Sequence, residues 1–232
     1  VFNDNGKSKP TMFIIHGYGG SKKDSISLAV QYARNGYFSV IFDAYGHGER
    51  TGGDLKSFPE VMAMYPYDIE KVVGSLKEQK QADLKRMGML GISMGACAIY
   101  KYCTFAEIKP KAITPFIGTP YYEQLMDSDL SRIAYDEKAG RSTSILTQQY
   151  LNQILADSSP YKNYQSLKDI AILMQNGGVD TMITPQGVNM LYHDLKGIGA
   201  ENVELIIYPE LWHEINDTGW DNAFAFMEKH LK

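Results

Sequence analysis

Short apolar runs alternate along the chain with segments in which apolar residues recur at helical spacing. The runs predict strands at 11–15, 38–42, 87–92, 111–117, 170–175 and 203–208. The amphipathic segments predict helices at 24–35, 66–79, 94–104, 186–196 and 220–231, with Pro66 in the first turn of its helix. Because strands separated by helices need crossover connections, the pattern predicts an α/β fold with a mainly parallel sheet and helices on both faces.

One long segment, 119–163, breaks this alternation. Its length of about 45 residues exceeds a normal crossover in a compact sheet, and two helices are expected in it, around 123–135 and 143–156. We interpret it as a small helical cap inserted over the active edge of a single domain that spans residues 1–232. A solvated surface decoration stays open as the alternative, because long surface insertions cost little free energy.

The candidate nucleophile is Ser93, which lies between two glycines in the run Gly91-Ile92-Ser93-Met94-Gly95. An apolar run ends here and a helical pattern begins, which is the setting of a strained elbow that exposes a serine oxygen above a sheet. The first amides of the helix and the positive end of its dipole would then face the serine. A serine that only caps a buried helix fits the segment equally well. The catalytic interpretation therefore depends on whether the chain also supplies an acid, a base and oxyanion donors.

The candidate acid is Asp180, because a serine nucleophile needs a base and a group that orients the base. Asp180 follows an apolar run and two glycines, so its carboxylate is expected at the C-terminal end of a strand. An aspartate that only closes an Asx turn is the alternative. Asp157 and Asp169 are weaker candidates because neither follows a predicted strand.

The candidate base is His213, which occupies the loop after the last predicted strand. Of the other histidines beyond Asp180, His193 falls inside a predicted helix and His230 in the last turn, where it complements the helix dipole. A solvated loop histidine is the alternative reading of His213. The chain order serine, aspartate, histidine and the strand-end placement favour the catalytic one.

The glycine-rich run His16-Gly17-Tyr18-Gly19-Gly20 follows the first predicted strand and is the candidate oxyanion site. We assign the two donors to the backbone N–H groups of Tyr18 and Met94. His16 is interpreted as structural. The loop 43–50 is either a structural turn, which is favoured, or part of the pocket wall. Aromatic side chains expected to line the pocket are Tyr18, Tyr121, Tyr122 and Trp212.

The composition of the chain excludes some classes of protein, but it does not indicate which kind of enzyme this is. A length of 232 residues with 44% apolar residues suits one domain with a sizeable core. A net charge of −4 without any basic block argues against nucleic acid or an anionic membrane as the main partner. Cys97 and Cys103 would project about 120° apart on one helix, so no disulfide is expected between them, and no residue cluster resembles a zinc site.

The location of the protein is inferred from what the chain lacks. It has no secretory leader and no apolar stretch long enough to span a bilayer, so a cytoplasmic protein is expected. The chain begins at Val1 rather than Met, which leaves open the removal of an upstream segment.

These motifs together resemble the α/β-hydrolases, in particular the dienelactone-hydrolase-like and cinnamoyl-esterase-like carboxylesterases. The resemblance rests on His16-Gly17, the loop Asp43 to Gly48, the elbow, Asp180 and His213, and it is weakest in the cap. It implies Ser93 as nucleophile, His213 as base and Asp180 as its orienting acid. Dienelactone hydrolases proper use a cysteine nucleophile, so the serine here favours an ordinary esterase.

The function expected from this resemblance is hydrolysis of carboxylic esters of small or aromatic acyl groups through an acyl-enzyme. It needs no metal or organic cofactor, and its partner is a small-molecule ester. A thioesterase or a short-peptide hydrolase on the same triad stays open, because the choice of leaving group depends on pocket shape. A binding protein on a hydrolase fold is a more distant alternative.

The N-terminus departs from the family pattern. Relatives usually have an antiparallel strand pair before the oxyanion strand, whereas only residues 1–10 precede it here. The sheet is therefore either minimal or truncated, and in a truncated sheet a flat exposed edge would favour a homodimer.

Overall fold

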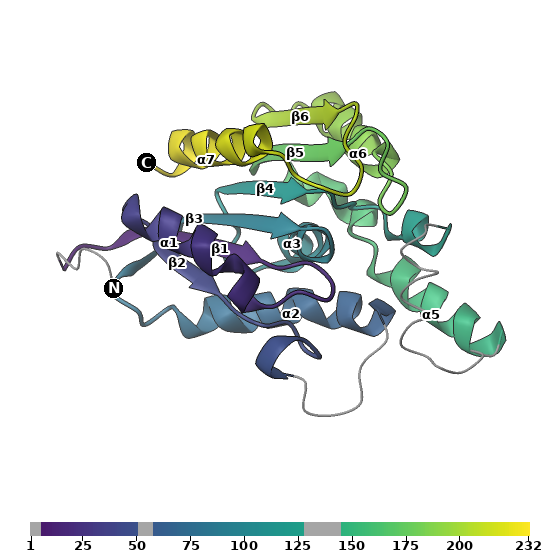
Figure 1. Cartoon of the computed structure of the whole chain (residues 1–232), viewed down its shortest axis with the longest axis horizontal. Helices are drawn as coiled ribbons and strands as arrows, with labels where there is room; N and C mark the ends of the chain where they lie inside the picture. Colours follow the sequence, from purple (N-terminus) through teal and green to yellow (C-terminus); the bar gives the residue numbers. More distant parts are fainter. Residues whose placement is uncertain (1–5, 51–57, 128–144) are drawn as a thin grey trace.

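The computed structural model describes residues 6–50, 58–127 and 145–232 and contains one six-stranded sheet (Figure 1). The strand order is β2-β1-β3-β4-β5-β6, and every neighbouring pair is parallel. The strands are β1 (Lys9–Ile15), β2 (Phe38–Ile41), β3 (Ala82–Ile92), β4 (Ala112–Phe116), β5 (Ala171–Gly177) and β6 (Val203–Tyr208). The helices are α1 (Ile26–Arg34), α2 (Phe58–Ser75), α3 (Met94–Phe105), α5 (Ile145–Ser158), α6 (Gln186–Gly197) and α7 (Asp217–Leu231).

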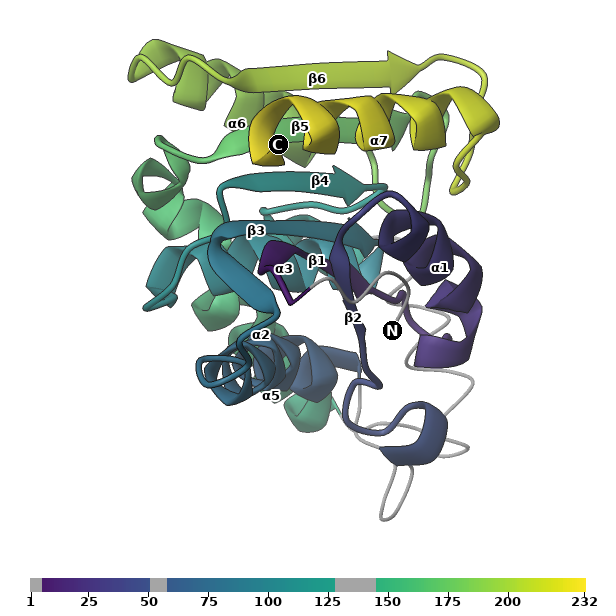
Figure 2. The same ribbon diagram turned by 90° about the vertical axis from the view of Figure 1, so that its left-hand side faces the viewer.

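Helices cover both faces of this sheet (Figure 2). α1 and α7 lie on one face and bury a core with side chains such as Met12, Leu90 and Met227. α2, α3 and α6 lie on the other face over a larger core that includes Phe13, Met89 and Leu191. The mainly parallel sheet with helices on both faces, expected from the alternating pattern, is confirmed.

β3 occupies the centre of the sheet and carries the elbow at its C-terminal end. Its residues from Met87 to Gly91 are all buried, as expected for a parallel strand covered on both faces. The strand begins at Ala82, five residues earlier than expected, because Lys9 and Pro10 of β1 pair with its start. The register shifts between Pro10 and Thr11, so the polar beginning of β3 hid the pairing from the hydrophobic pattern.

Three expected helices begin at other residues in the structure, and the last of them, α7, begins at Asp217 rather than at residue 220. α2 is in place by Phe58, so the expectation that Pro66 lies in a first turn is wrong: the proline is inside the helix. Pro66 removes one backbone hydrogen bond there, and its ring is buried with the neighbouring Tyr65 in the core side of the helix. The helix expected from residue 24 is divided into a short 3-10 turn, η1 (Lys22–Ser25), and α1.

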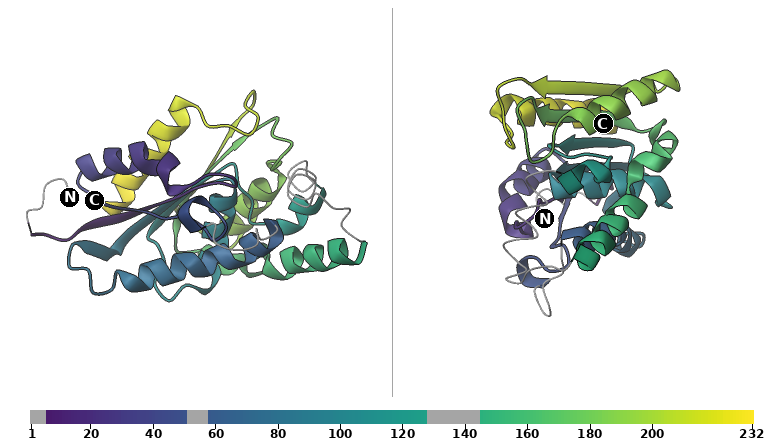
Figure 3. Two further views of the ribbon diagram at one scale, coloured as in Figure 1. Left: turned by 60° about the horizontal axis from the view of Figure 1, so that its bottom comes forward. Right: turned by 90° about the vertical axis from the view of Figure 1, so that its right-hand side faces the viewer.

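Most of the described residues in the segment 119–163 are helical. They are the 3-10 turn η3 (Tyr122–Asp127), α5 and the start of η4 (Pro160–Leu167), and α5 contacts α2 and extends beyond its end (Figure 3). α5 corresponds to the second expected helix, at 143–156. Only the first residues of the other expected helix, 123–135, are described, as the turn η3, and the rest lies outside the described residues.

Cys97 and Cys103 are both buried and form no disulfide, as expected. Burial raises the pKa of each thiol to about 12, so neither is a ready nucleophile at neutral pH. Within the described ranges, no helix has the length and apolar character needed to cross a membrane.

Candidate active site

The backbone at Ser93 is held in a conformation that L-residues rarely adopt, with φ of 53° and ψ of −115°. Its N–H donates to the carbonyl of Phe116 on β4 (2.9 Å), and its carbonyl accepts from the N–H of Cys97 on α3 (3.0 Å). Strain of this kind costs about 1–3 kcal/mol and persists only where the surroundings impose it. Here the strand β3, the helix α3 and the neighbouring strand together impose it.

The two glycines of the elbow are required by close packing. A Cβ at Gly95 would lie 2.3 Å from the carbonyl oxygen of Ile15, and a Cβ at Gly91 would lie 2.7 Å from the amide of Ala96. Both neighbours are backbone atoms that cannot move aside. The spacing of glycines around Ser93 therefore allows α3 to begin directly against β1 and β3.

Ser93, His213 and Asp180 form one continuous line of hydrogen bonds. His213 Nε2 lies 2.9 Å from Ser93 Oγ, and His213 Nδ1 lies 2.7 Å from Asp180 Oδ2. Because a carboxylate only accepts, the Nδ1 proton must donate to Asp180, which leaves Nε2 to accept the hydroxyl proton of the serine. The serine and the aspartate are 7% and 2% exposed, so the line is shielded from bulk water.

The loop after β5 fixes the carboxylate of Asp180. Its Oδ1 accepts from the backbone N–H groups of Met182 and Ile183, both at 2.9 Å, so only Oδ2 faces the histidine. The buried Asn176 donates from Nδ2 to the carbonyl of Ile183 (3.0 Å) and braces the far end of the same loop. Asn176 has no motif of its own, and sequence reasoning missed it.

The loop that carries His213 lies directly against this acid loop. The N–H of Gly178 donates to the carbonyl of Tyr208 (2.7 Å), and the N–H of Val179 donates to that of Leu211 (3.2 Å). A Cβ at Gly177 would lie 2.1 Å from the carbonyl oxygen of Trp212. The glycines before Asp180 therefore permit the loops after β5 and β6 to pack against each other. The two glycines directly after a predicted strand were the feature of the sequence that indicated this close approach.

The glycine-rich loop after β1 also reaches the elbow. A Cβ at Gly17 would lie 3.2 Å from the carbonyl oxygen of Ile92 and 3.5 Å from Ser93 Cβ, so Tyr18 follows a residue that lies beside Ser93. Met94 is the first residue of α3, and a first helical N–H has no acceptor within its own helix. The backbone thus places Gly17, which precedes Tyr18, and Met94 next to Ser93.

His16 has a structural role in the same loop. Its Nδ1–H donates to the carbonyl of Gly17 (2.8 Å), and its Nε2 accepts from the N–H of Ala44 (3.0 Å). Burial lowers the pKa of this imidazole, which suits the neutral form that these two bonds require. The histidine therefore joins the loop after β1 to the loop after β2.

The alternative acids and bases lie elsewhere. Asp157 is on α5, where it accepts from Gln153, and Asp169 precedes β5 at the opposite end of that strand from Asp180. His193 is exposed on α6, and His230 is near the C-terminal end of α7. The structure thus brings none of the four into the line of hydrogen bonds at Ser93.

The turn η3, after β4, joins α3 to the loop that carries Asp180. Tyr122 is completely buried and donates its hydroxyl to the carbonyl of Cys97 (2.7 Å), so the expectation that it lines the pocket is wrong. Gln124 Nε2 donates to the carbonyl of Thr184 (2.8 Å), just beyond Asp180. Trp212 remains 48% exposed, and its ring contacts that of His213.

The described residues were also compared with the ligand sets that bind metal ions. Across residues 6–50, 58–127 and 145–232, no three His, Cys, Asp or Glu side chains are grouped so that they could hold a metal ion. The chemistry offered by the site is that of a serine hydroxyl beside an oriented imidazole.

Comparisons with known proteins agree with this architecture. The model of the family described as serine aminopeptidase, S33, matches residues 6–118. Esterase YjfP of Escherichia coli (strain K12) is 22% identical over 230 residues, which cover 96% of this chain and 89% of that protein. YitV of Bacillus subtilis (strain 168) is 28% identical over 135 residues, 55% of this chain, and the match spans only about half of that protein (51%).

Among solved structures, acetyl xylan esterase 1 from Thermoanaerobacterium sp. JW/SL YS485 superimposes with a TM-score of 0.75. The two sequences are 19% identical, and the match covers 97% of this chain and 76% of that one. At this identity the likeness shows a shared fold.

Proposed function

Because this chain belongs to the α/β-hydrolase superfamily, we propose that it hydrolyses carboxylic esters, with Ser93 as nucleophile, His213 as base and Asp180 as the orienting acid. The observation that carries this proposal is the unbroken line of hydrogen bonds from Ser93 Oγ through the imidazole to Asp180 Oδ2. In such a line the acid fixes the tautomer of the imidazole and stabilises the imidazolium that forms during the reaction.

Acylation begins when His213 Nε2 takes the hydroxyl proton and Ser93 Oγ attacks the acyl carbonyl. The tetrahedral intermediate collapses by breaking the bond to the alcohol oxygen, which leaves with the proton from Nε2. A water molecule then gives a proton to the same nitrogen, attacks the acyl-enzyme and releases the acid and the free serine. Every proton passes through one imidazole, so the steps need no metal and no organic cofactor.

The backbone N–H groups of Tyr18 and Met94 are proposed as the donors to the oxyanion. The contact between Gly17 and the elbow and the position of Met94 at the start of α3 support this assignment. Loss of one such donor typically lowers kcat by about 10²–10³-fold.

The substrates proposed are esters of small or aromatic acyl groups, and the segment 119–163 is proposed as a cap beside the site. Names of relatives support the ester, since an esterase and an acetyl xylan esterase are among them. A second candidate is the hydrolysis of short peptides, because the family that matches residues 6–118 is described as serine aminopeptidase. The same triad would serve both reactions.

A fluorophosphonate probe tests the proposal directly. We expect the folded protein to gain one adduct on Ser93, detected by intact mass and peptide mapping, and Ser93→Ala to gain none while keeping its thermal midpoint. Absence of an adduct on the folded wild-type protein would contradict the proposal that the chain is a serine hydrolase and would favour a binding protein. Rates on p-nitrophenyl esters, acyl-CoA and aminoacyl amides then separate esterase, thioesterase and peptidase.

A further inference from the structure

The strand β5 carries two buried amide side chains, Gln175 and Asn176, after a run of apolar residues. Burying an amide costs free energy unless its polar atoms are hydrogen-bonded, so each of these side chains needs partners. Consecutive residues of a strand face opposite sides of the sheet. Asn176 reaches the acid loop through the carbonyl of Ile183, whereas Gln175 faces the side of the sheet that α7 covers.

Gln175 contacts both ends of the segment that carries His213. Its Oε1 accepts the hydroxyl proton of Tyr208, the last residue of β6 (2.6 Å), and its Nε2 donates to the carbonyl of Gly219 in the first turn of α7 (3.2 Å). The loop 209–216, which contains His213, connects these two points of the chain. A side chain that is only 1% exposed therefore sets the separation between the two ends of this loop.

The neighbouring hydrogen bonds explain why this position holds an amide. The oxygen of Tyr208 also accepts from Nδ2 of Asn222 on α7 (3.2 Å), so its own proton is directed to Gln175. The N–H of Gly219 donates to the side chain of Asn216, the N-cap of α7 (2.8 Å). An amide supplies the one acceptor and the one donor that these partners need, whereas a carboxylate lacks the donor and a thioether side chain lacks a strong group of either kind.

The backbone of Gln175 contacts the turn beside Ser93. Its carbonyl accepts from the N–H of Ile117 (2.8 Å), and the carbonyl of the preceding Phe116 accepts from the N–H of Ser93 (2.9 Å). Ile117 has a φ of 42°, which is an outlier for a β-branched residue, so the surrounding structure must hold this turn in place. One residue of β5 thus contacts both the turn beside Ser93 and the ends of the segment that carries His213.

We propose that Gln175 is a positioning residue that keeps the imidazole of His213 aligned with Ser93 and Asp180; the inference rests on the proposed function. The imidazole bonds to Ser93 Oγ at 2.9 Å and to Asp180 Oδ2 at 2.7 Å, and such a constellation works only if each group stays within about 0.5 Å of its place. Backbone bonds to the acid loop hold the base loop as far as Leu211. Gln175 adds the connection between the start of this loop and α7.

The experiment removes the two side-chain bonds of Gln175 and follows the hydrolysis of p-nitrophenyl acetate. Gln175→Met keeps the length of the side chain and removes both bonds, whereas Tyr208→Phe removes only the bond to Oε1. We expect Gln175→Met to lower kcat at least about tenfold, because a misplacement of about 1 Å can cost about 10²-fold. KM should stay close to the wild-type value, because the buried amide does not reach the substrate. Tyr208→Phe should lower kcat less, since the bond to Gly219 remains.

A spectroscopic measurement reports the alignment of the imidazole without any substrate. The proton that His213 Nδ1 donates to Asp180 lies in a charge-assisted hydrogen bond, which moves its ¹H NMR resonance far downfield. The resonance is identified by its loss in His213→Ala. We expect it to disappear or to move upfield in Gln175→Met, a change that a purely structural role of the amide would not cause.

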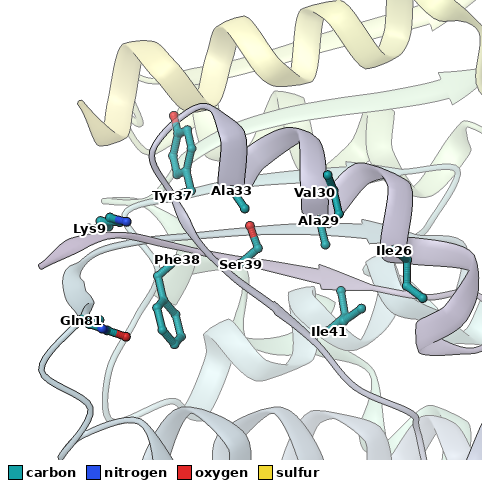
Figure 4. Close-up of a pocket in the computed structure, with 10 residues that line it drawn as sticks. All are labelled: Lys9, Ile26, Ala29, Val30, Ala33, Tyr37, Phe38, Ser39, Ile41 and Gln81. Carbon is teal, nitrogen blue, oxygen red and sulfur yellow. The ribbon is translucent and has the colours of Figure 1, made fainter. Parts of the chain in front are cut away.

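Two controls measure the effect of lost stability alone. Tyr102→Phe also removes a hydroxyl that donates over 2.6 Å, here to the carbonyl of Ile108, beyond the C-terminal end of α3. Val30→Ala removes two methyl groups from the wall of a hollow of about 370 Å³ between α1 and β2, the edge strand furthest from β6 (Figure 4). Both should lower the thermal midpoint, keep the downfield resonance and leave kcat within about twofold, because distant sites act independently.

The outcomes separate this inference from the proposed function. If folded Gln175→Met keeps the wild-type kcat and the downfield resonance, or if the controls lose as much kcat, the positioning role is overturned and the hydrolase stands. If wild-type protein neither hydrolyses the ester nor takes up the fluorophosphonate probe, the proposed function fails. The resonance then decides alone: its loss in Gln175→Met supports the positioning of His213, and its persistence overturns it. Should Gln175→Met not fold, the same readouts in Tyr208→Phe decide.

Discussion

Asp43 and Asp180 look alike in sequence and in burial, yet their surroundings differ in one respect. Each follows a strand, each lies in a glycine-rich loop, and they are 3% and 2% exposed. Asp43 accepts from the N–H of Lys22 on Oδ1 and from the N–H of Glu49 on Oδ2, and the Lys22 ammonium lies 3.3 Å from Oδ2. Asp180 gives one oxygen to backbone N–H groups and presents the other to an imidazole.

The difference shows how the partners of a buried carboxylate distinguish a structural role from a role in orienting a titratable side chain. When both oxygens are held by backbone donors and a lysine, the carboxylate joins segments of chain and has nothing left to orient. When one oxygen is fixed and the other meets a titratable ring, the scaffold aims the carboxylate at that ring. Four changes test this distinction.

The largest effect is expected from Asp180→Asn. The amide can still accept from Met182 and Ile183, but its NH₂ would face His213 Nδ1 and favour the wrong tautomer. We expect kcat on p-nitrophenyl acetate to fall about 10⁴-fold with a thermal midpoint close to that of wild type. Asp43→Asn is the matched control, and a comparable loss of kcat there would erase the distinction.

Next in size are the glycines that each loop requires. A Cβ at Gly177 would meet the carbonyl oxygens of Trp212 and Leu211, so Gly177→Ala should separate the acid loop from the base and lower kcat about 10²-fold. A Cβ at Gly48 would lie 2.2 Å from the carboxylate of Asp43, and φ there is +55°. Gly48→Ala should therefore lower the thermal midpoint and change kcat less than Gly177→Ala; the reverse pattern would contradict the comparison.

A smaller effect, and on stability alone, is expected from Asp43→Asn. The amide keeps one acceptor and leaves a partly buried backbone N–H of Lys22 or Glu49 without its partner. The free energy of unfolding at neutral pH should fall by about 1–3 kcal/mol, measured by urea denaturation. The kcat of the folded variant should remain within a few-fold of wild type.

The smallest effect is the pH dependence of that stability difference. Burial alone would raise the pKa of Asp43, but the N–H groups of Lys22 and Glu49 and the Lys22 ammonium lower it below its ordinary value of 3.8. A carboxylate with a lowered pKa stabilises the fold above its unfolded pKa, and the contribution is lost as the pH falls through the folded pKa. The gap in unfolding free energy between wild type and Asp43→Asn should be constant above about pH 5 and shrink below pH 4. A gap that widens on acidification would show that the charge of Asp43 does not stabilise the fold.

The local features of this molecule were readable from sequence, and the long-range ones were not. Apolar runs located all six strands, because a parallel strand buried on both faces has a continuous apolar signature. The order β2-β1-β3-β4-β5-β6 has no such signature, and the polar start of β3 was missed because its pairing partners lie some seventy residues earlier. Pro66 was misplaced because a proline suggests a helix start, whereas packing tolerates it within α2.

The candidate site divides in the same way. Motif, chain order and strand-end placement predict Ser93, Asp180 and His213, and the structure places Ser93 and Asp180 each within hydrogen-bonding distance of His213. The supporting residues carry no local signal. Asn176 and Gln124 act only through loops that the fold brings to them, and Tyr122 was read as a pocket residue although its hydroxyl meets a backbone carbonyl in the core.

The strand order also has a consequence for synthesis on the ribosome. The first four strands, β2-β1-β3-β4, are neighbours in the sheet and are complete by residue 118, where the family match also ends. At about 5–20 residues per second, the codon for His213 follows roughly 5–20 s later. During that interval Ser93 has been synthesised but His213 has not, and β4, buried along its whole length in the finished sheet, is an apolar edge open to other chains. The arrival of β5 therefore covers the exposed edge of β4 first, and the proposed triad of Ser93, His213 and Asp180 can assemble only after β6 has followed.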